Sequence, residues 1–255
     1  MLIGIAGLAG SGKDTAGDFI KEIIPDAQKI TFAGPIKWFA ARVFDFPYET
    51  IYGPSNLRNT ADERLQPWDV EHHFGLGWAK AHQNFHRLRF QFATEFLCRG
   101  AGDLSSETRD RALRCLDDWF CDHILTHDKP LTVRHILQTL GTECGRRFDP
   151  DVWVNYALSY AKDPTKTYYV TDVRFVNEMA AVSGDPANSL WWITRPDSGL
   201  AGDAGLHESE RYLADLTLRD LYATGTYHND SSIGDLGAWV AEQLFSLKYD
   251  CKKAG

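Results

Sequence analysis

The first thirteen residues constrain the fold of this chain more than any other segment. A short apolar run, Leu2–Ala6, has the composition of a strand that is buried on both faces of a sheet. It is followed by the glycine-rich stretch Gly7–Lys13 and then by Asp14–Ile24, where apolar residues recur at helical spacing until Pro25. A strand, a tight turn and a helix in this order predict the first unit of a parallel α/β sheet.

The turn itself has the spacing Gly7-x4-Gly12-Lys13 of a phosphate-binding loop. Glycine is needed where the backbone turns sharply and presents its N–H groups to a ligand, because a Cβ would obstruct the approach. Such N–H groups and the start of the following helix cradle phosphate oxygens, and the lysine adds a positive charge. The alternative is a plain strand–helix turn with an incidental lysine. We predict that ATP binds at Ala9, Gly10, Ser11, Gly12, Lys13, Asp14 and Thr15.

One position departs from the usual pattern of these loops. After Lys13, a serine or threonine usually binds Mg²⁺ through its hydroxyl, whereas this chain has Asp14 followed by Thr15. A carboxylate is also a hard oxygen ligand, so Asp14 is a candidate Mg²⁺ ligand, either directly or through water. Thr15 would then support a phosphate or the water shell of the metal. Alternatively, Asp14 only interacts with the dipole of the helix that it begins.

Strand and helix signals continue to alternate along the chain. Further strands are predicted near Lys29–Phe32, Thr167–Thr171, Leu190–Thr194 and Ala223–His228. Further helices are predicted over Pro35–Phe44, Phe85–Cys98, Glu107–Leu125, Thr132–Leu140, Pro150–Tyr160 and Ile233–Leu247, with Gly141–Asp149 as a break between two of them. This order predicts an α/β fold of three layers, with a parallel sheet and helices on both of its faces.

The segment from Pro47 to Lys129 interrupts this alternation and is rich in Trp, His and Arg. At about 80 residues it is too long for a loop without secondary structure, so it must contain helices of its own. We interpret residues 1–255 as one domain with a mostly helical insertion at about 48–130.

Charge and composition exclude several classes of protein. The net charge is −8, from 27 Lys and Arg against 35 Asp and Glu, which argues against binding of a nucleic-acid polymer but leaves small phosphorylated ligands open. No stretch approaches the ~18 apolar residues of a membrane span, and the first residues lack the basic region of a secretory signal. The five cysteines form no CxxC pair, which favours reduced thiols and a cytoplasmic location.

Several blocks of sequence carry a resemblance to a known family. They are Gly10–Thr15 (GSGKDT), Phe32–Lys37 (FAGPIK), Arg134–Glu143 (RHILQTLGTE), Pro150–Asn155 (PDVWVN) and Asp172–Glu178 (DVRFVNE), with weaker matches at His207–Glu210 and Asn229–Ile233. In these blocks the chain resembles bacteriophage deoxynucleoside monophosphate kinases, which are similar to the P-loop nucleoside monophosphate kinases. Animal phosphomevalonate kinases share the GKD-type loop, but the LGTE and DVRFxNE blocks favour the phage enzymes.

The resemblance implies a homodimeric enzyme that uses ATP and Mg²⁺ to phosphorylate deoxynucleoside 5′-monophosphates to diphosphates, which supply DNA synthesis. A phage-encoded enzyme would act in the cytoplasm of the host. In-line phosphoryl transfer needs positioning and charge neutralisation. The acceptor needs no general base because its second phosphate pKa is about 6. The candidate catalytic residues are Lys13, Arg134, Asp172, Arg174 and Glu178.

The DVRFVNE block contributes three of these candidates. Asp172 follows the β-rich run, where it can orient Mg²⁺ through water, and Arg174 lies at the carboxyl end of the same strand, where α/β folds place ligands. Glu178 would position either a substrate hydroxyl or Arg174. The alternative is a local salt bridge at a strand–helix junction. The candidate metal ligands are thus Asp14 and Asp172.

The acceptor site has a second group of candidates. Arg134 and Gln138 share a helical face, where the guanidinium suits a phosphate and the amide suits a base edge. Trp153 either stacks on the base or packs in the core. The candidate substrate-binding residues are Lys37, Arg134, Gln138, Trp153, Arg174 and Glu178.

Two other functions fit the loop. One is a P-loop kinase for a non-nucleotide phosphorylated acceptor, such as a phosphomevalonate-like substrate. The other is a regulator that binds nucleotides without turnover. Product formation with a panel of acceptors distinguishes all three.

Overall fold

Five parallel strands form one sheet in the first of two compact units. In the computed structural model, which describes residues 1–66, 76–127, 129–199 and 208–253, this unit comprises Met1–Phe32 and Leu158–Gly255. The strands lie in the order β2-β3-β1-β4-β5. Their bounds are β1 Leu2–Ala6, β2 Gln28–Lys29, β3 Tyr168–Val173, β4 Ser189–Thr194 and β5 Gly225–His228.

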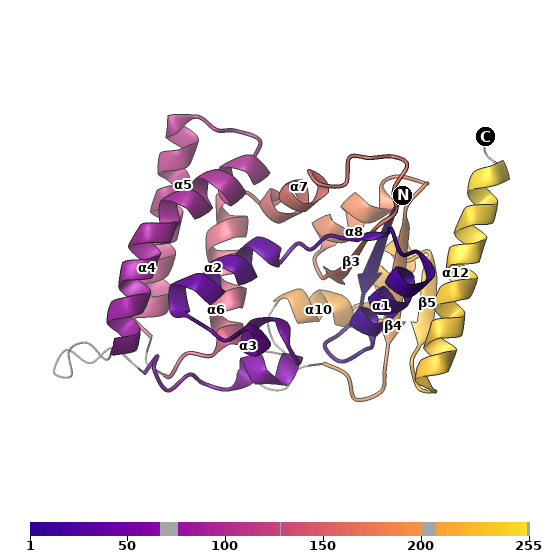
Figure 1. Cartoon of the computed structure of the whole chain (residues 1–255), viewed down its shortest axis with the longest axis horizontal. Coiled ribbons are helices and arrows are strands. Elements are labelled where there is room, and N and C mark those ends of the chain that lie inside the picture. Colours follow the sequence, from indigo (N-terminus) through magenta and orange to yellow (C-terminus); the bar gives the residue numbers. More distant parts are fainter. Residues whose placement is uncertain (67–75, 128, 200–207, 254–255) are drawn as a thin grey trace. The chain divides into compact units, whose positions relative to one another are not determined.

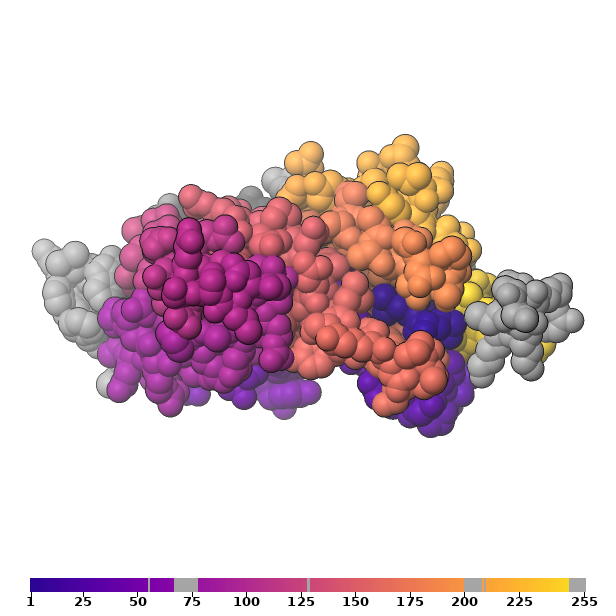
Figure 2. All heavy atoms as spheres, turned by 90° about the horizontal axis from the view of Figure 1, so that it is seen from above, coloured from indigo at the N-terminus to yellow at the C-terminus, as the bar shows by residue number. Residues whose placement is uncertain are grey.

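The central strand comes from the N-terminus and its two neighbours come from much later in the chain. Ile3 of β1 is in register with Tyr169 of β3 on one side and with Ser189 of β4 on the other. In Figure 2 the indigo atoms of the N-terminal segment accordingly lie among orange atoms of the later segments. Because every pairing is parallel, the residues that follow β1, β3, β4 and β5 meet at one edge of the sheet.

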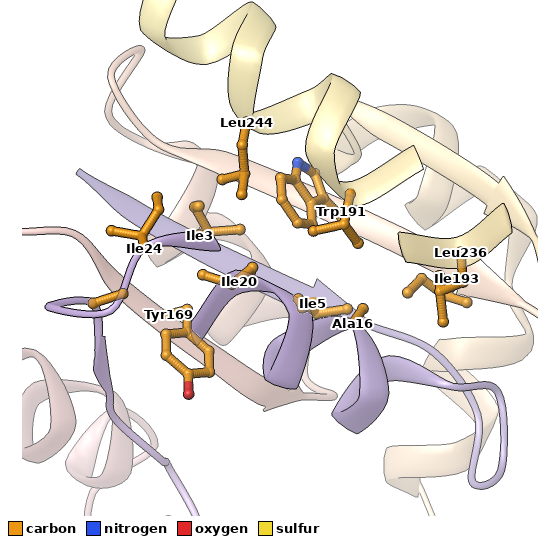
Figure 3. Close-up of a cluster of buried hydrophobic side chains, with 12 residues drawn as sticks. Ile3, Ile5, Ala16, Ile20, Ile24, Tyr169, Trp191, Ile193, Leu236 and Leu244 are labelled. Atoms are coloured by element: carbon orange, nitrogen blue, oxygen red, sulfur yellow. The ribbon is translucent and has the colours of Figure 1, made fainter. Parts of the chain in front are cut away.

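Helices cover both faces of this sheet (Figure 1). On one face, α1 (Lys13–Ile23) and α12 (Ile233–Lys253) pack on side chains of the inner strands. Figure 3 shows this cluster, in which Leu236 and Leu244 of α12 point toward the sheet that carries Trp191. On the other face, Val182 of α8 (Val176–Ser183) packs on Gly4, where a Cβ would lie 2.9 Å from the valine methyl group. The predicted α/β fold of three layers with a parallel sheet is confirmed.

Two further helices, α10 (Glu208–Ala214) and α11 (Leu216–Tyr222), lie between β4 and β5 in the sequence. Among the described residues, no helix combines the length and the apolar character that crossing a membrane requires.

Several predicted boundaries were wrong. The helix predicted to begin at Phe85 begins at Leu76. Asp172 does not follow its strand, because β3 extends to Val173, which pairs with Ala6. The strand predicted near Lys29–Phe32 is shorter and earlier, because β2 spans only Gln28–Lys29. Thr31, which follows it, donates a hydrogen bond from its hydroxyl to the Asp172 carboxylate. The break predicted after Leu140 is absent, because the helix continues to Arg146 in a π-helical form.

The second compact unit, Ala33–Ala157, is helical and contains the described part of the expected insertion. Its α-helices are α2 Gly34–Phe44, α3 Tyr48–Tyr52, α4 Leu76–Phe92, α5 Ser106–Trp119, α6 Val133–Thr139 and α7 Val152–Leu158. A short 3-10 helix η1 spans Ser55–Asn59, and the π-helical segments η3 Ala93–Cys98, η4 Phe120–Leu125 and η5 Leu140–Arg146 continue α4, α5 and α6.

Aromatic side chains form much of the core of this unit. Phe39 of α2 stacks on Phe92 of α4 with ring centroids 4.3 Å apart, and Phe85 stacks on Phe120 at 4.0 Å. The buried indole of Trp119 donates a hydrogen bond to the Thr139 hydroxyl at 3.0 Å. These contacts connect α2, α4, α5 and α6, and the five aromatic side chains in them are almost fully buried.

The π-helical segment η5 packs on Trp153 of α7. The indole N–H of Trp153 donates to the Gly141 carbonyl at 2.9 Å, and a Cβ on Gly145 would lie 2.0 Å from the indole ring. Gly145 is therefore needed for close approach of the two helices.

We predict that Gly145→Ala destabilises the protein by about 1–3 kcal/mol, because the added methyl group overlaps the Trp153 ring. The unfolding temperature and the urea midpoint measure this loss. Gly234→Ala is the matched control, since a Cβ there has no described neighbour closer than 3.6 Å. Equal unfolding temperatures for the two variants would contradict the packing argument.

Candidate functional site

The glycine-rich loop between β1 and α1 adopts a conformation that requires two of its glycines. A Cβ on Gly7 would lie 2.4 Å from the Ile193 carbonyl oxygen of β4. Gly12 has φ +102°, in the left-handed region, and a Cβ there would lie 2.4 Å from Nδ2 of Asn229. Other side chains at these positions would displace the loop from the sheet edge.

Neighbouring segments fix the loop through its main-chain oxygens. The buried Asn229, which directly follows β5, donates from its side-chain amide to the Ser11 carbonyl at 2.8 Å. Its own N–H donates to the Thr194 carbonyl at 2.7 Å, and the N–H of Gly199 donates to the Ala9 carbonyl at 2.8 Å. Sequence reasoning did not assign Asn229 to the site; its only signal was the weaker family-like block that it begins.

Two polar side chains of the loop are buried without the partners that their chemistry calls for. The Ser11 hydroxyl is fully buried and forms no hydrogen bond with the described residues. Lys13 is 7% exposed, and its ammonium group donates to the Leu8 carbonyl at 3.3 Å. Buried polar groups are normally satisfied, so this loop is suited to an anionic ligand that brings further acceptors.

The charges around Lys13 alter its acidity. The pKa of Lys13 is lowered from 10.5 to about 8, mainly because the ammonium group is buried and also because of the positive charge of Arg174, while Asp14, Glu210 and Asp172 act in the opposite direction. Phosphate groups at the loop would add negative charge beside this ammonium group and favour its charged form.

Asp172 and Glu178 occupy well-defined positions at the same sheet edge. The carboxylate of Asp172 accepts from the Thr31 hydroxyl at 2.5 Å and from the Phe32 N–H at 3.2 Å. Glu178 is 2% exposed, and its carboxylate accepts from the N–H groups of Arg174 at 2.7 Å and Phe175 at 3.1 Å. Glu178 therefore caps the start of α8 and holds the backbone of Arg174 in place.

The side chain of Arg174 forms an ion pair with Glu210 of α10, from its NH1 group to the carboxylate Oε1. The sequence did not reveal this partner, because 35 residues separate the two and Glu210 belongs only to the weak His207–Glu210 block. His207 lies outside the described residues.

The two candidate metal ligands are hard carboxylates on neighbouring elements. Asp14 is 71% exposed, accepts from the Thr171 hydroxyl at 2.7 Å and lies 3.8 Å from the Lys29 ammonium group. Within the described ranges, no group of three or more His, Cys, Asp or Glu could hold a metal ion. Mg²⁺ in kinase sites takes one or two carboxylates and completes its shell with water and phosphate, so Asp14 and Asp172 fit that role.

The remaining candidates belong to the helical unit. Arg134 is 7% exposed, and its Nε donates to the Asn59 side chain; Gln138 is half-buried one turn further along α6. The ammonium group of Lys37 lies 5.7 Å from the centre of the Tyr52 ring. Trp153 is 2% exposed, and its indole N–H donates a hydrogen bond to the Gly141 carbonyl. This placement favours packing in the core over stacking on a base.

A comparison with protein families identifies the family of the chain. The family model described as deoxynucleotide monophosphate kinase matches residues 1–217. The chain belongs to the deoxynucleotide monophosphate kinase family. This kinase is a phosphotransferase that acts on deoxynucleoside monophosphates, and the membership decides against the two alternative functions left open above. No curated protein matches the chain.

The lowered pKa of Lys13 predicts that ATP binding to the metal-free kinase depends on pH. As pH rises through about 8, Lys13 loses its proton and its attraction for phosphate, so we predict weaker ATP binding. The affinity should fall by about tenfold between about pH 7 and about pH 9. Isothermal titration calorimetry in the absence of divalent cations measures this change. In Lys13→Arg the guanidinium stays charged, so the pH dependence should disappear; an unchanged dependence would assign it to another group.

Proposed function

We propose that this kinase transfers the γ-phosphoryl group of ATP, together with Mg²⁺, to deoxynucleoside 5′-monophosphates by in-line displacement. The observation that carries the proposal is the loop itself, in which Lys13 and a Ser11 hydroxyl with no hydrogen-bond partner among the described residues are buried on either side of the left-handed Gly12. Residues Ala9–Thr15 would hold the triphosphate, as the loop motif predicts.

The chemistry requires electrostatic stabilisation more than acid–base catalysis. The monophosphate acceptor is already an oxyanion at neutral pH, because its second pKa is about 6. Lys13 and Arg174 would stabilise the charge that develops on the transferring phosphoryl group, and Glu178 holds the Arg174 backbone. These groups would also offset the repulsion between the two anionic substrates.

The acceptor would bind residues of the helical unit. We assign the monophosphate to Arg134 and Lys37 and the base edge to Gln138, because these side chains supply the cationic and amide groups that such ligands need. Trp153 is left out of this assignment, since its indole N–H already donates to the Gly141 carbonyl and its ring packs on Gly145.

Mg²⁺ would be held by Asp14 and Asp172, directly or through water, together with phosphate oxygens. The ion neutralises phosphate charge when it is bound. The hydrogen bonds that Asp172 accepts from Thr31 and Phe32 restrain its carboxylate, which supports this assignment.

The biological setting rests on the resemblance to the phage enzymes alone. On that basis we propose a homodimer that acts in the cytoplasm, of the host if the gene belongs to a phage, and supplies diphosphates for DNA synthesis. The same basis supports one kinase domain over residues 1–255, with the helical insertion at about 48–130.

A substrate panel tests the proposed reaction directly. Each monophosphate, in its deoxy and ribo forms, is incubated with ATP and Mg²⁺, and formation of ADP and of the nucleoside diphosphate is measured. We expect both products from at least one deoxynucleoside monophosphate and none from phosphomevalonate. Absence of ADP with every nucleotide would refute the proposal.

Two substitutions test the cationic residues. We predict that Lys13→Ala abolishes transfer with little effect on the unfolding temperature, since it removes a charge that the core does not need. Arg174→Ala should lower kcat by about 10²-fold if its guanidinium stabilises transition-state charge. If either substitution lowers the unfolding temperature and leaves kcat unchanged, the substituted residue has a structural role and not the predicted catalytic one.

A third substitution tests the metal ligand. Asp14→Ala should raise the Mg²⁺ concentration that gives half-maximal activity by about tenfold. Asp18→Ala, an exposed acid on the same helix, is the matched control. Unchanged activity and Mg²⁺ dependence in Asp14→Ala would assign Asp14 to the helix dipole only.

A further inference from the structure

Glu210 is a buried acid beside the phosphate loop that the proposed mechanism does not use. Its side chain is 3% exposed and lies in α10. One carboxylate oxygen, Oε1, accepts from Arg174, whereas Oε2 is buried and has no hydrogen-bond partner in the described part of the chain. Its charge also acts on Lys13, so it contributes to the electrostatics of both cations of the site.

Stability alone does not explain this carboxylate. Burial removes the hydration of both charges, so a buried ion pair often contributes little net stabilisation, and apolar side chains of similar size serve as well. A carboxylate with one oxygen unpaired is less favourable still. An unsatisfied buried group of this kind calls for a specific explanation.

The physical need arises from the two cations. Lys13 and Arg174 carry like charges that repel each other. A negative charge beside the guanidinium offsets that repulsion, and Glu210 supplies one. Glu178 holds only the backbone N–H of Arg174. Glu210 holds the other end, because it binds the guanidinium itself. The two acids come from different helices, α8 and α10, and together restrain a long side chain at both ends.

This restraint leaves most of the guanidinium available. Arginine carries five N–H donors, and the contact with Glu210 uses the NH1 group. Nε and NH2 donate to no other residue among those that the structure describes. Donors that are ordered before the reaction stabilise transition-state charge without the entropy loss of fixing them during it.

We infer that Glu210 is a positioning residue that holds the Arg174 guanidinium at the phosphate loop, so that its remaining N–H groups bind the transferring phosphoryl group. The inference rests on the proposed role of Arg174. Glu210 itself contacts no substrate in this scheme.

The decisive experiment is a double-mutant cycle on the full-length kinase with ATP, Mg²⁺ and a deoxynucleoside monophosphate that it accepts. Glu210→Gln keeps the side-chain volume and one acceptor oxygen but removes the charge. We expect kcat to fall about tenfold while KM for ATP changes less than about twofold, because the lost interaction acts in the transition state. In the Arg174→Ala background, Glu210→Gln should change kcat by less than about twofold.

Two further variants keep the test decisive. Asp220→Asn removes the acid of the Arg219–Asp220 pair in the same unit and should leave kcat unchanged. Glu210→Asp keeps the negative charge on a side chain that is shorter by one methylene group, and it should retain a higher kcat than Glu210→Gln. If the glutamine variant unfolds at the assay temperature, the aspartate variant is compared with the original kinase instead.

The outcomes separate the two levels of the argument. Full kcat in Glu210→Gln, or independent losses that multiply in the double variant, would overturn the inference while leaving the role of Arg174 intact. Full kcat in Arg174→Ala would overturn both. A tenfold loss that disappears in the Arg174→Ala background supports Glu210 as the residue that positions the guanidinium.

Discussion

The arrangement of the site depends on a lysine charge that is held in a buried turn. Lys13 begins α1 directly after a glycine whose φ of +102° no other residue adopts readily, and the turn leaves its ammonium group 7% exposed. A buried cation is unfavourable without counter-charges. The acids Asp14, Asp172 and Glu210 all act on it, and none of them carries the main contact, which is a backbone oxygen. The loop thus retains a capacity for further negative charge, which a triphosphate would supply.

Parallel strand pairing brings these groups together. The loop follows β1, Arg174 follows β3 and Asn229 follows β5, although more than 200 residues separate the first from the last. One sheet edge therefore combines a main-chain anion cradle, a guanidinium and the amide that fixes the loop at Ser11. The order β2-β3-β1-β4-β5 also places the N-terminal strand at the centre, where α1 and α12 cover one face and α8 the other.

The helical unit obtains its shape from close packing of aromatic side chains on small residues. Trp153 packs where Gly145 has no side chain, and its indole N–H satisfies a carbonyl of the π-helical segment η5. These contacts favour a packing role for Trp153, whereas its helical spacing in the sequence is equally consistent with packing and with base stacking. Arg134 and Gln138, the proposed acceptor residues, both lie on α6 of this unit. A helix holds such side chains more rigidly than a loop does.

The sequence by itself determined the strand–loop–helix unit and the parallel α/β class, because glycine conformation and the hydrophobic period are local properties. The same loop motif predicted Lys13 as the cation of the candidate phosphate site. Glu178 was also identified, but as a partner of substrate or Arg174, and its N-capping of α8 became visible only with the backbone in place. Only the tertiary structure decided that Glu210 pairs with Arg174, that Asn229 holds the loop and that Trp153 packs on Gly145. These contacts join segments distant in the chain, and their partners are chosen by the distance and burial that folding imposes, which no local pattern encodes.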